Sequence, residues 1–415
     1  MVTHKQLHIS ITMNKFLLLA AFLLSMLTSK AQNPYLPLWE YVPDAEPYVF
    51  EDPDHPGKFR LYIYGSHDSL RDAYCGLEQV VWSAPIDNLT QWRYDGIIFT
   101  SVKDRDGNLL HSDGRGDLLY APDVTMREEN GQKVYYLYPN NQEVGREGMV
   151  AKSLRPDGPF EVINWSTTDA QRTDGVLRFD PAVFIDDDGQ AYLFWGSSNV
   201  YPLRGKKLNK DDRFLIEGET VELFGLDMPK HGWERFGENH TDTVLGGYME
   251  GAWLTKHDGK YYMQYAAPGT EFNVYADGVY VADYPMGPYT YQKHNPVSYK
   301  PGGYMNGAGH GSTVLGPGGQ YWHFASMSLS INVNWERRLC MFPAGFDKDG
   351  IMYVDTCFGD YPRYAPAVPG KAGQFRGWML LSYGKPVTAF TTKDEFKADA
   401  LTDELTKTFW LAEAN

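Results

Sequence analysis

The sequence predicts an all-β protein, and within that class a five-bladed β-propeller. One hairpin pattern occurs five times: an apolar strand, a polar turn that ends in Gly-Lys or Gly-Gln, and an aromatic strand. The turn glycines recur at intervals of 58 to 74 residues and are Gly57, Gly131, Gly189, Gly259 and Gly319. A β-unit that recurs in this way indicates an array of small sheets, and few stretches carry the spacing of an amphipathic helix. Aromatic residues make up 15% of the chain, which suits strands that pack on pleated surfaces.

Each repeat supplies the first two strands of one blade. The repeats span residues 46–66, 121–140, 180–198, 249–265 and 310–326. Further hairpins fill the gaps, for example at 79–99 and 148–163, so that two hairpins give a four-stranded sheet. Five such sheets packed radially make a propeller. A β-sandwich is the structural alternative, but it gives no reason for five copies of one hairpin.

The N-terminus predicts a secretory signal peptide over residues 1–31. After Met13, a plausible start, Lys15 provides the positive end, residues 16–27 form an apolar core, and Ser29-Lys30-Ala31 is a small-x-small cleavage site. The core is too short for a membrane-spanning helix, and no cysteine follows it to carry a lipid anchor. We therefore expect a secreted or periplasmic bacterial protein whose propeller occupies residues 32–370.

Charge and cysteine content exclude several classes of function. The net charge of −15 argues against nucleic acid or an anionic membrane as a partner and suits a neutral or cationic ligand. The three cysteines, Cys75, Cys340 and Cys357, allow at most one disulfide and match no zinc or redox spacing. They serve equally well as small buried residues.

Polar residues stand at the start of every predicted inner strand. Because the inner strands of a propeller line its axis, these side chains should converge on one funnel. For one aspartate before a strand, a turn cap is the better interpretation, but five coinciding positions favour a functional centre. The residues are Asp180, Glu250 and His310 in one register, with Asp123 two residues after Ala121 in blade two, and Glu46 with Asp44 in blade one.

Converging carboxyl groups indicate either glycoside hydrolysis or a cation site. Hydrolysis needs one carboxylic acid to protonate the leaving oxygen and one carboxylate to activate water or attack carbon. Crowding raises the pKa of one such group, so that it stays protonated near neutral pH. The chain contains no G-x-S-x-G, H-E-x-x-H or paired C-x-x-C motif, which argues against a serine nucleophile and a catalytic zinc.

The same motifs resemble those of glycoside hydrolase family 43. The resemblance covers roughly residues 33 to 365 and rests on "VPDAEPYVF", "YAPDV", "FDPAVFIDDDGQAYLFWG", "MEGAWLTKHDGKYYMQY" and "GHGSTVLGPGG", which occur in this order at matching blade positions. It implies a five-bladed propeller that hydrolyses O-glycosyl bonds with inversion, mostly of the α-L-arabinofuranosidase or β-xylosidase type.

The resemblance also implies roles for the carboxylates. Glu250 in "MEGAW" matches the general acid, and Asp180 in "FDPAVF" matches the aspartate that orients the acid and holds its pKa. For the general base, Asp44 follows the Pro-Asp motif, whereas Glu46 occupies the strand-aligned position; Asp44 is favoured and Glu46 is the alternative. Asp123 in "APDV" is expected to orient the sugar.

Further residues are candidates for sugar or metal contact. His310 matches a family histidine that often lies beside a central calcium or a water cluster, so the only cofactor expected is a possible structural Ca²⁺, and none is required. One arginine of the pair Arg337-Arg338 matches a family arginine that contacts the sugar or the acid, although a salt bridge explains it nearly as well. Tryptophans stack on sugar faces but more often pack between blades; the candidates are Trp82, Trp253, Trp233 and Trp335.

The pattern changes in the last part of the chain, residues 371–415. "GKPVTAF" and the residues that follow resemble the start of a discoidin-like sugar-binding module, and 389–415 should pack poorly alone. The alternative is a divergent strand that closes the propeller. We expect a monomer that acts on plant oligo- or polysaccharides of the arabinan or arabinoxylan type. The alternative functions are a non-catalytic carbohydrate-binding propeller and an exo-galactosidase-type member of the family.

Overall fold

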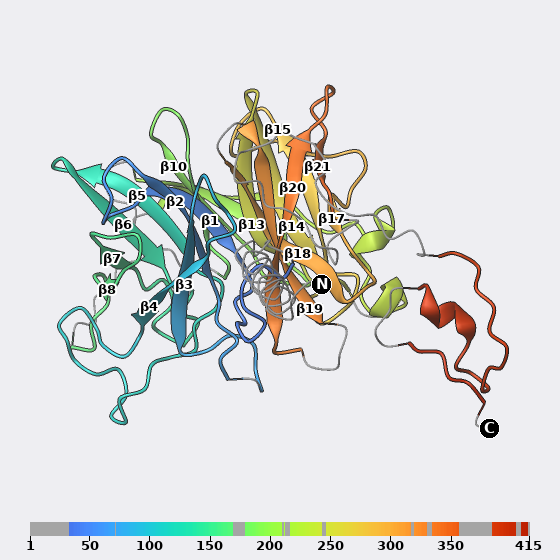
Figure 1. The fold of residues 1–415 in the computed structure, drawn as a ribbon. Helices are drawn as coiled ribbons and strands as arrows, with labels where there is room; N and C mark the ends of the chain where they lie inside the picture. The colour runs from blue at the N-terminus through green and yellow to red at the C-terminus, as the bar shows by residue number, and fades with distance from the viewer. Residues whose placement is uncertain are drawn as a thin grey trace, which may run out of the picture.

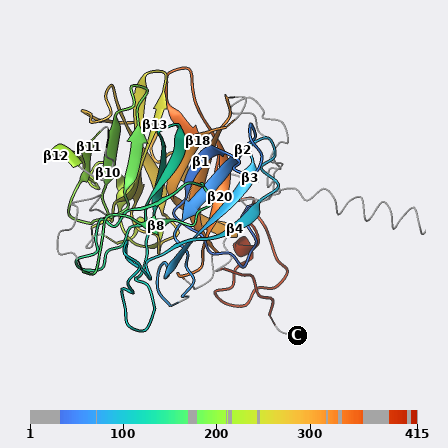
Figure 2. The same cartoon turned by 90° about the vertical axis from the view of Figure 1, so that its left-hand side faces the viewer.

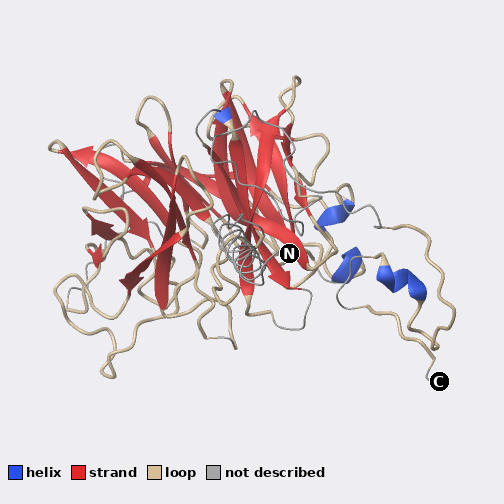
Figure 3. Ribbon diagram, viewed as in Figure 1, coloured by secondary structure: helices blue, strands red, loops and turns tan. Residues whose placement is uncertain are grey.

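The computed structural model describes residues 33–70, 72–168, 179–209, 211, 216–242, 246–316, 319–329, 334–356, 384–403 and 408–413. The expected signal peptide, Cys357 and the linker residues 371–383 lie outside the described residues. Five antiparallel sheets form a ring, which confirms the predicted five-bladed propeller (Figure 1). Strands dominate the ring, and the helical turns are short (Figure 3). Within the described part of the chain, no helix has the length and apolarity that crossing a membrane demands.

The sheets follow one another in chain order. Blade one contains β1 (Glu46–Glu51), β2 (Phe59–Gly65), β3 (Glu78–Pro85) and β4 (Arg93–Thr100), and blade two contains β5 (Asp123–Glu129), β6 (Gln132–Tyr138), β7 (Ala151–Ser153) and β8 (Glu161–Val162). Blade three contains β9 (Ala182–Ile185), β10 (Ala191–Trp195), β11 (Leu203–Leu208) and β12 (Ile216–Phe224). Blade four contains β13 (Glu250–His257), β14 (Lys260–Ala267), β15 (Ala276–Ala282), β16 (Thr290–Tyr291) and β17 (Ser298–Tyr299). Blade five contains β18 (Met305–Leu315), β19 (Tyr321–Leu329), β20 (Arg337–Phe346) and β21 (Met352–Val354).

The repeated turn glycines have a conformational reason. All five adopt a left-handed backbone with φ between 73° and 79°, which glycine enters without the steric cost of a Cβ. The glycines therefore fix the position of each first hairpin, and with it the register of the inner strand. These inner strands lie next to one another around the axis; β1, β13 and β18 are visible together in Figure 2.

The ring closes where blade one meets blade five. No strand from one end of the chain joins the sheet of the other end among the described residues, so side chains make this contact. The amide of Asn33 exchanges two hydrogen bonds with the backbone of Met341, at 3.1 and 2.8 Å. An apolar cluster spans the same seam and includes Leu61, Trp82 and Phe324. Burial of this cluster is the main force that closes the ring, because the hydrogen bonds only replace those made to water.

Phe324→Ala is expected to lower the free energy of unfolding by about 3–5 kcal/mol, because it leaves a cavity in the closing seam. Phe324 is fully buried and meets the rings of Tyr35 and Trp92 edge-on. Phe59→Ala is the matched control, since half of the Phe59 side chain is exposed, and it should cost less than about 1 kcal/mol. Urea denaturation of the three proteins measures both values, and equal losses would contradict a tightly packed seam.

The described C-terminal residues, 384–403 and 408–413, lie to one side of the propeller (Figure 1). Their regular structure is limited to the 3-10 turn η4 (Ala398–Leu401), and the large side chains of Phe390, Leu401 and Phe409 are exposed. Phe396 and Phe409 stack on each other with ring centroids 4.7 Å apart. The described part of this segment thus shows no core of its own, and the origin of the segment in a discoidin-like module stays a prediction.

Candidate active site

A cavity of about 290 Å³ opens at the end of the inner strands where the chain enters them. Its charged lining comes from blades one, three, four and five and consists of Asp44, Asp180, Glu250, Glu271, His310 and Arg337. Half of the remaining lining residues are aromatic: Tyr74, Tyr120, Phe179, Phe236 and Tyr248. The structure therefore brings together five of the residues that the sequence selected, and it adds Glu271, which motif comparison did not indicate.

Three of these side chains belong to residues with a left-handed backbone conformation, which turns the side chains into the cavity. Asp44, Asp180 and His310 have φ values of 58°, 50° and 45°, although none of them is glycine. Such conformations cost free energy and persist where the surrounding structure over-determines them, often at functional sites. In blade four, Gly251 takes this conformation instead, with φ of 62°. A Cβ on Gly251 would lie 3.0 Å from the His310 ring, so the glycine of "MEGAW" lets the imidazole lie against the backbone beside Glu250.

The structure places Asp44, and not Glu46, in the cavity. Glu46 pairs with Tyr64, directly before Gly65, whereas Ala182 pairs with Phe194, two residues before Gly196. Counted from these two glycines, Glu46 corresponds to Pro181 and Ala45 to Asp180, so neither acid of blade one stands in the register of Asp180. Asp44 precedes β1 and shares the left-handed backbone of Asp180, and this local conformation rather than strand alternation brings its side chain to the cavity.

Asp44 is a buried carboxylate held by opposite charge and hydrogen bonds. Its Oδ2 accepts a hydrogen bond of 2.6 Å from Ser66, and its Oδ1 lies 2.9 Å from Nη1 of Arg337 and 3.4 Å from Nδ1 of His310. Burial alone would raise the pKa of Asp44, but Arg337, His310 and the Ser66 hydroxyl together hold that pKa below its ordinary value. Asp44 is therefore charged at neutral pH.

Arg337 owes its position to an aspartate that the sequence did not single out. Asp68 accepts two parallel hydrogen bonds from the guanidinium, 2.9 Å from Nε and 2.8 Å from Nη2. The third nitrogen of the guanidinium is left to face Asp44. This fork geometry is specific to arginine and leaves the group little freedom. Asp68 could have been found only through its partner, which lies 269 residues away in the chain.

Glu250 is surrounded by hydroxyl groups and by other titratable groups. Its Oε1 accepts a hydrogen bond from Tyr275, and its Oε2 lies 3.5 Å from the Ser197 hydroxyl. Glu250, Asp180 and His310 each present one atom able to bind a metal ion, and these atoms lie within 4.8 Å of one another. Tyr275 belongs to no motif noted in the sequence, and Ser197 lies at the end of the third repeat without having been selected as a site residue.

Asp180 is close to the acidic groups Glu250 and Asp44 and is also hydrogen-bonded to blade two. Its Oδ1 accepts a hydrogen bond of 3.1 Å from Asn140, while its Oδ2 is buried without a hydrogen-bond partner among the described residues. Burial, together with the nearby charges of Glu250 and Asp44, raises the pKa of Asp180 to about 7. For His310 burial favours the neutral ring, but the carboxylates of Asp44, Asp180 and Glu250 outweigh it and raise the pKa of the imidazole.

Glu46 and Asp123 are buried and do not line the cavity. Asp123 accepts hydrogen bonds from the Tyr48 hydroxyl and from the backbone N–H groups of Val124 and Val183, and burial raises its pKa to about 7. Burial, followed by repulsion from Asp123, Asp180 and Asp44, raises the pKa of Glu46 well above its ordinary value. Neither residue lines the cavity: Asp123 is held by Tyr48 and by backbone N–H groups, and Glu46 lies close enough to Asp180 and Asp44 to be repelled by their charges.

The tryptophan candidates lie mostly outside the cavity. The indole N–H of Trp82 donates to Glu40, that of Trp253 to the backbone of Thr313, and that of Trp233 to the Tyr291 hydroxyl. Trp335 packs edge-on against Tyr74, which does line the cavity, with ring centroids 4.4 Å apart. Arg338 also points away, since it donates to the backbone of Leu38 and lies over the ring of Tyr41.

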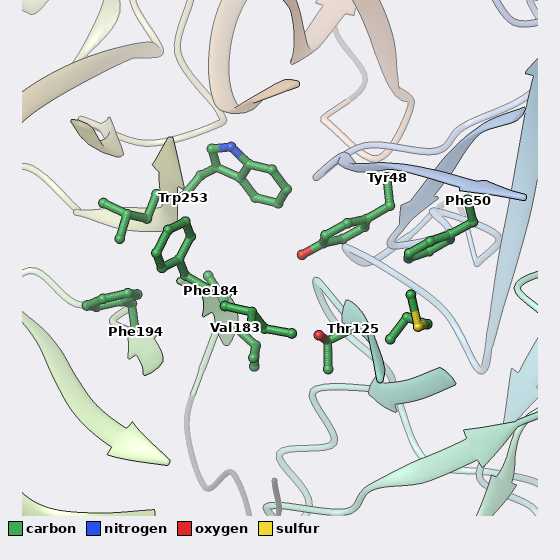
Figure 4. A pocket seen from close by; sticks show the side chains of 11 residues that line it. Tyr48, Phe50, Thr125, Val183, Phe184, Phe194 and Trp253 are labelled. Carbon is green, nitrogen blue, oxygen red and sulfur yellow. The ribbon is translucent and has the colours of Figure 1, made fainter. Parts of the chain in front are cut away.

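Trp253 instead borders a separate, mainly apolar cavity of about 240 Å³ (Figure 4). The inner strands of blades one to four bound it, and its walls include the rings of Tyr48, Phe50, Phe184 and Phe194. Tyr48 joins this cavity to the buried carboxyls, because its hydroxyl donates to Asp123.

Comparisons with known proteins agree with this architecture. The model of the family described as "Glycosyl hydrolases family 43" matches residues 62–352. A protein of Thermoclostridium stercorarium named "Xylosidase/arabinosidase" is 37% identical over 202 residues, which cover 47% of this chain and 37% of that protein. A protein of Bacteroides ovatus with the same name is 28% identical over 63% of this chain and 80% of its own length. The chain thus spans little more than a third of the first relative.

Solved structures show the same fold. A crystal structure titled as a thermostable family-43 glycoside hydrolase superposes with a TM-score of 0.58 at 21% identity and covers 83% of this chain and 99% of that one. At this identity the likeness is one of fold, and the chemistry must be argued from the side chains of the cavity.

Proposed function

Because the chain belongs to glycosyl hydrolases family 43, we propose that it is a secreted glycosidase that removes α-L-arabinofuranosyl or β-D-xylosyl residues from plant polysaccharides with inversion. The sugars are those in the names of the relatives, which include two arabinoxylan arabinofuranohydrolases. The acidic chain suits a neutral polysaccharide. The proposed secretion rests on the signal-like N-terminal sequence.

The observation that carries the proposal is the pairing of Asp44 and Glu250 in one cavity. Inverting hydrolysis needs a carboxylate that takes a proton from water and a carboxylic acid that gives a proton to the glycosidic oxygen. Asp44 suits the first role, since Arg337 and His310 keep it charged. Glu250 suits the second, since its carboxyl lies among Tyr275, Ser197 and the buried Asp180.

In the proposed reaction Asp44 removes a proton from a water molecule, and the water oxygen forms a bond to the anomeric carbon. The bond from that carbon to the leaving oxygen breaks, and Glu250 supplies the proton that the leaving oxygen takes up. Asp180 does not react. Asp180 and His310 lie beside Glu250, so they help to orient the acid.

We propose that the reaction requires no metal ion, and the possible Ca²⁺ beside His310 fits the site poorly. Calcium takes six to eight oxygen ligands, whereas the cluster offers two carboxyl groups and one imidazole. The raised pKa of His310 favours the protonated ring, which cannot bind a metal. A cation on Glu250 would also compete with the proton that the acid must deliver.

A panel of 4-nitrophenyl glycosides tests the proposal. The protein should hydrolyse the α-L-arabinofuranoside or the β-D-xyloside faster than the galactosides, and NMR should show that the first product has the opposite anomeric configuration. Absence of turnover with retained sugar binding would instead support a carbohydrate-binding propeller. A first product of unchanged configuration would contradict the inverting mechanism.

Arg337→Gln is expected to move the acidic limb of the kcat/KM profile to higher pH. The wild-type guanidinium keeps Asp44 charged until the pH falls through its lowered pKa. Removing that cation raises the pKa of Asp44, by about one to three pH units for a charge at this distance. Arg337→Lys is the matched control, because it keeps the charge and should shift the limb less. Profiles of the three proteins measure the effect, and an unmoved limb would show that Asp44 does not control it.

A further inference from the structure

A larger cavity, of about 510 Å³ and here called the second cavity, adjoins the one that holds Asp44 and Glu250. Phe179 and Ser197 line both cavities, so the two are neighbours that share a wall. Gln142 and Glu147 from blade two form one side of the larger cavity, and the chain from Trp195 to Arg204 in blade three forms the other. No residue selected from the sequence lies in it.

The shared wall lies beside the carboxyl group of Glu250, the proposed general acid. The Ser197 hydroxyl lies 3.5 Å from Oε2 of Glu250 and 2.8 Å from the Tyr248 hydroxyl. A general acid must lie within hydrogen-bond reach of the oxygen that it protonates. In a glycoside that oxygen joins the departing sugar to the sugar or chain left behind. The group left behind therefore begins beside Glu250, on the side where the second cavity opens.

Both sides of the second cavity are tied to the proposed catalytic carboxylates. The backbone of Ser198 exchanges hydrogen bonds of 3.0 and 2.9 Å with that of Met249, the residue before Glu250. On the other side, the amide of Gln142 donates to Asn140, whose own amide donates to Asp180. A ligand in this cavity would thus be positioned by the same elements that position Glu250 and Asp180.

The lining of the second cavity has the chemistry that suits a sugar. The Tyr201 side chain is 60% exposed, and the Arg204 guanidinium lies 4.9 Å from the centre of its ring. The Ser198 hydroxyl accepts hydrogen bonds from the backbone N–H groups of Val200 and Tyr201, at 2.9 and 3.0 Å, which fixes the loop that carries the ring. An aromatic face for C–H groups, beside amide, carboxylate and guanidinium groups for hydroxyls, matches a neutral polyhydroxylated ring.

We propose that this second cavity binds the sugar unit on the leaving-group side of the bond that is cleaved, with Tyr201 as its stacking platform. The inference rests on the proposed function, because it uses Glu250 as the acid. It makes the protein selective for the polysaccharide or oligosaccharide part of the substrate and not only for the sugar that is released.

Tyr201→Ala tests this assignment on two kinds of substrate. Xylotriose and an arabinofuranosyl-xylotriose place a sugar in the second cavity, whereas β-D-xylosyl fluoride and α-L-arabinofuranosyl fluoride carry only a fluoride leaving group. The variant should lower kcat/KM for the oligosaccharides by about tenfold, the effect of losing one aromatic contact. It should leave kcat/KM for the fluorides unchanged.

Two further variants serve as controls. Tyr201→Phe keeps the ring and should retain most of the oligosaccharide activity. Tyr284→Ala removes a similarly exposed tyrosine that lines neither cavity and should change nothing. Equal losses on both kinds of substrate, or no loss on the oligosaccharides, would overturn the assignment while the proposed function stands. If the unaltered protein hydrolyses neither kind of substrate, the proposed function fails and the assignment fails with it.

Discussion

Glu250→Gln is expected to lower kcat/KM for arabinoxylan oligosaccharides by about 10²–10⁴-fold, the usual contribution of a positioned general acid. Glutamine keeps the size of the side chain and can still interact with the Tyr275 and Ser197 hydroxyls, but it has no proton to deliver. The loss should therefore appear in kcat more than in substrate binding. Steady-state kinetics and a thermal melt of the two proteins measure the effect and check that the fold is intact.

The leaving group separates loss of proton donation from general damage to the site. A 2,4-dinitrophenyl glycoside releases a phenolate that needs no proton, so Glu250→Gln should hydrolyse it at close to the wild-type rate. If the variant lost as much activity on this substrate as on the oligosaccharides, Glu250 would not be the acid. Wild-type activity of the variant on both substrates would show that Glu250 takes no part in the mechanism.

Asp44→Asn is expected to lower kcat by a similar factor of about 10²–10⁴, but on every substrate. The reason is that water must be activated whatever group leaves. Asparagine fills the same space between Ser66 and Arg337 and cannot accept a proton from water. Activity on the dinitrophenyl glycoside thus distinguishes the two variants: it should survive in Glu250→Gln and disappear in Asp44→Asn.

Glu46→Gln is the matched control for Asp44→Asn. Both residues are buried acids at the start of blade one, but only Asp44 lines the cavity. Glu46→Gln should therefore keep catalytic activity close to that of the wild type. The reverse result, an inactive Glu46 variant and an active Asp44 variant, would assign the base to Glu46 and contradict the assignment of Asp44.

The repeated hairpin was predictable because its determinants are local. A left-handed turn glycine such as Gly259 and the strands on either side of it lie within about twenty residues, and period-two patterns mark strands from such short windows. The number of blades follows from counting these units. The motif residues Asp180, Glu250 and His310 were predictable for the same reason, since each stands in a constant position relative to its own hairpin.

The choice between Asp44 and Glu46 was not predictable in this way. Alignment of the apolar strand favours Glu46, and only the pairing with β2 shows that Glu46 lies one residue out of register with Asp180. Asp44 lies one residue out on the other side, before β1, and reaches the cavity through its own left-handed backbone. A local pattern with gaps in the turn before the strand cannot resolve such a geometry.

Trp82 and Trp253 show a second limit of the sequence. An aromatic residue in a strand pattern has the same signature whether its ring meets a sugar or the next blade. In the fold both indole groups donate to protein oxygens, Glu40 and the backbone of Thr313, and both rings are at least nine-tenths buried. Burial is set by neighbours that come from distant repeats, so the distinction appears only after the blades pack.

The sequence by itself determined the architecture, the repeated inner strands and the set of acids at their ends, because hairpins and turn glycines act over short distances. The tertiary structure alone decided which acid is charged and which groups surround it. Arg337 is 293 residues from Asp44 and 269 residues from Asp68 in the sequence, and it contacts both at the seam where the ring closes. Electrostatic and hydrogen-bond interactions depend on separation in space. The pKa shifts of this site therefore arise only when blade five packs against blade one.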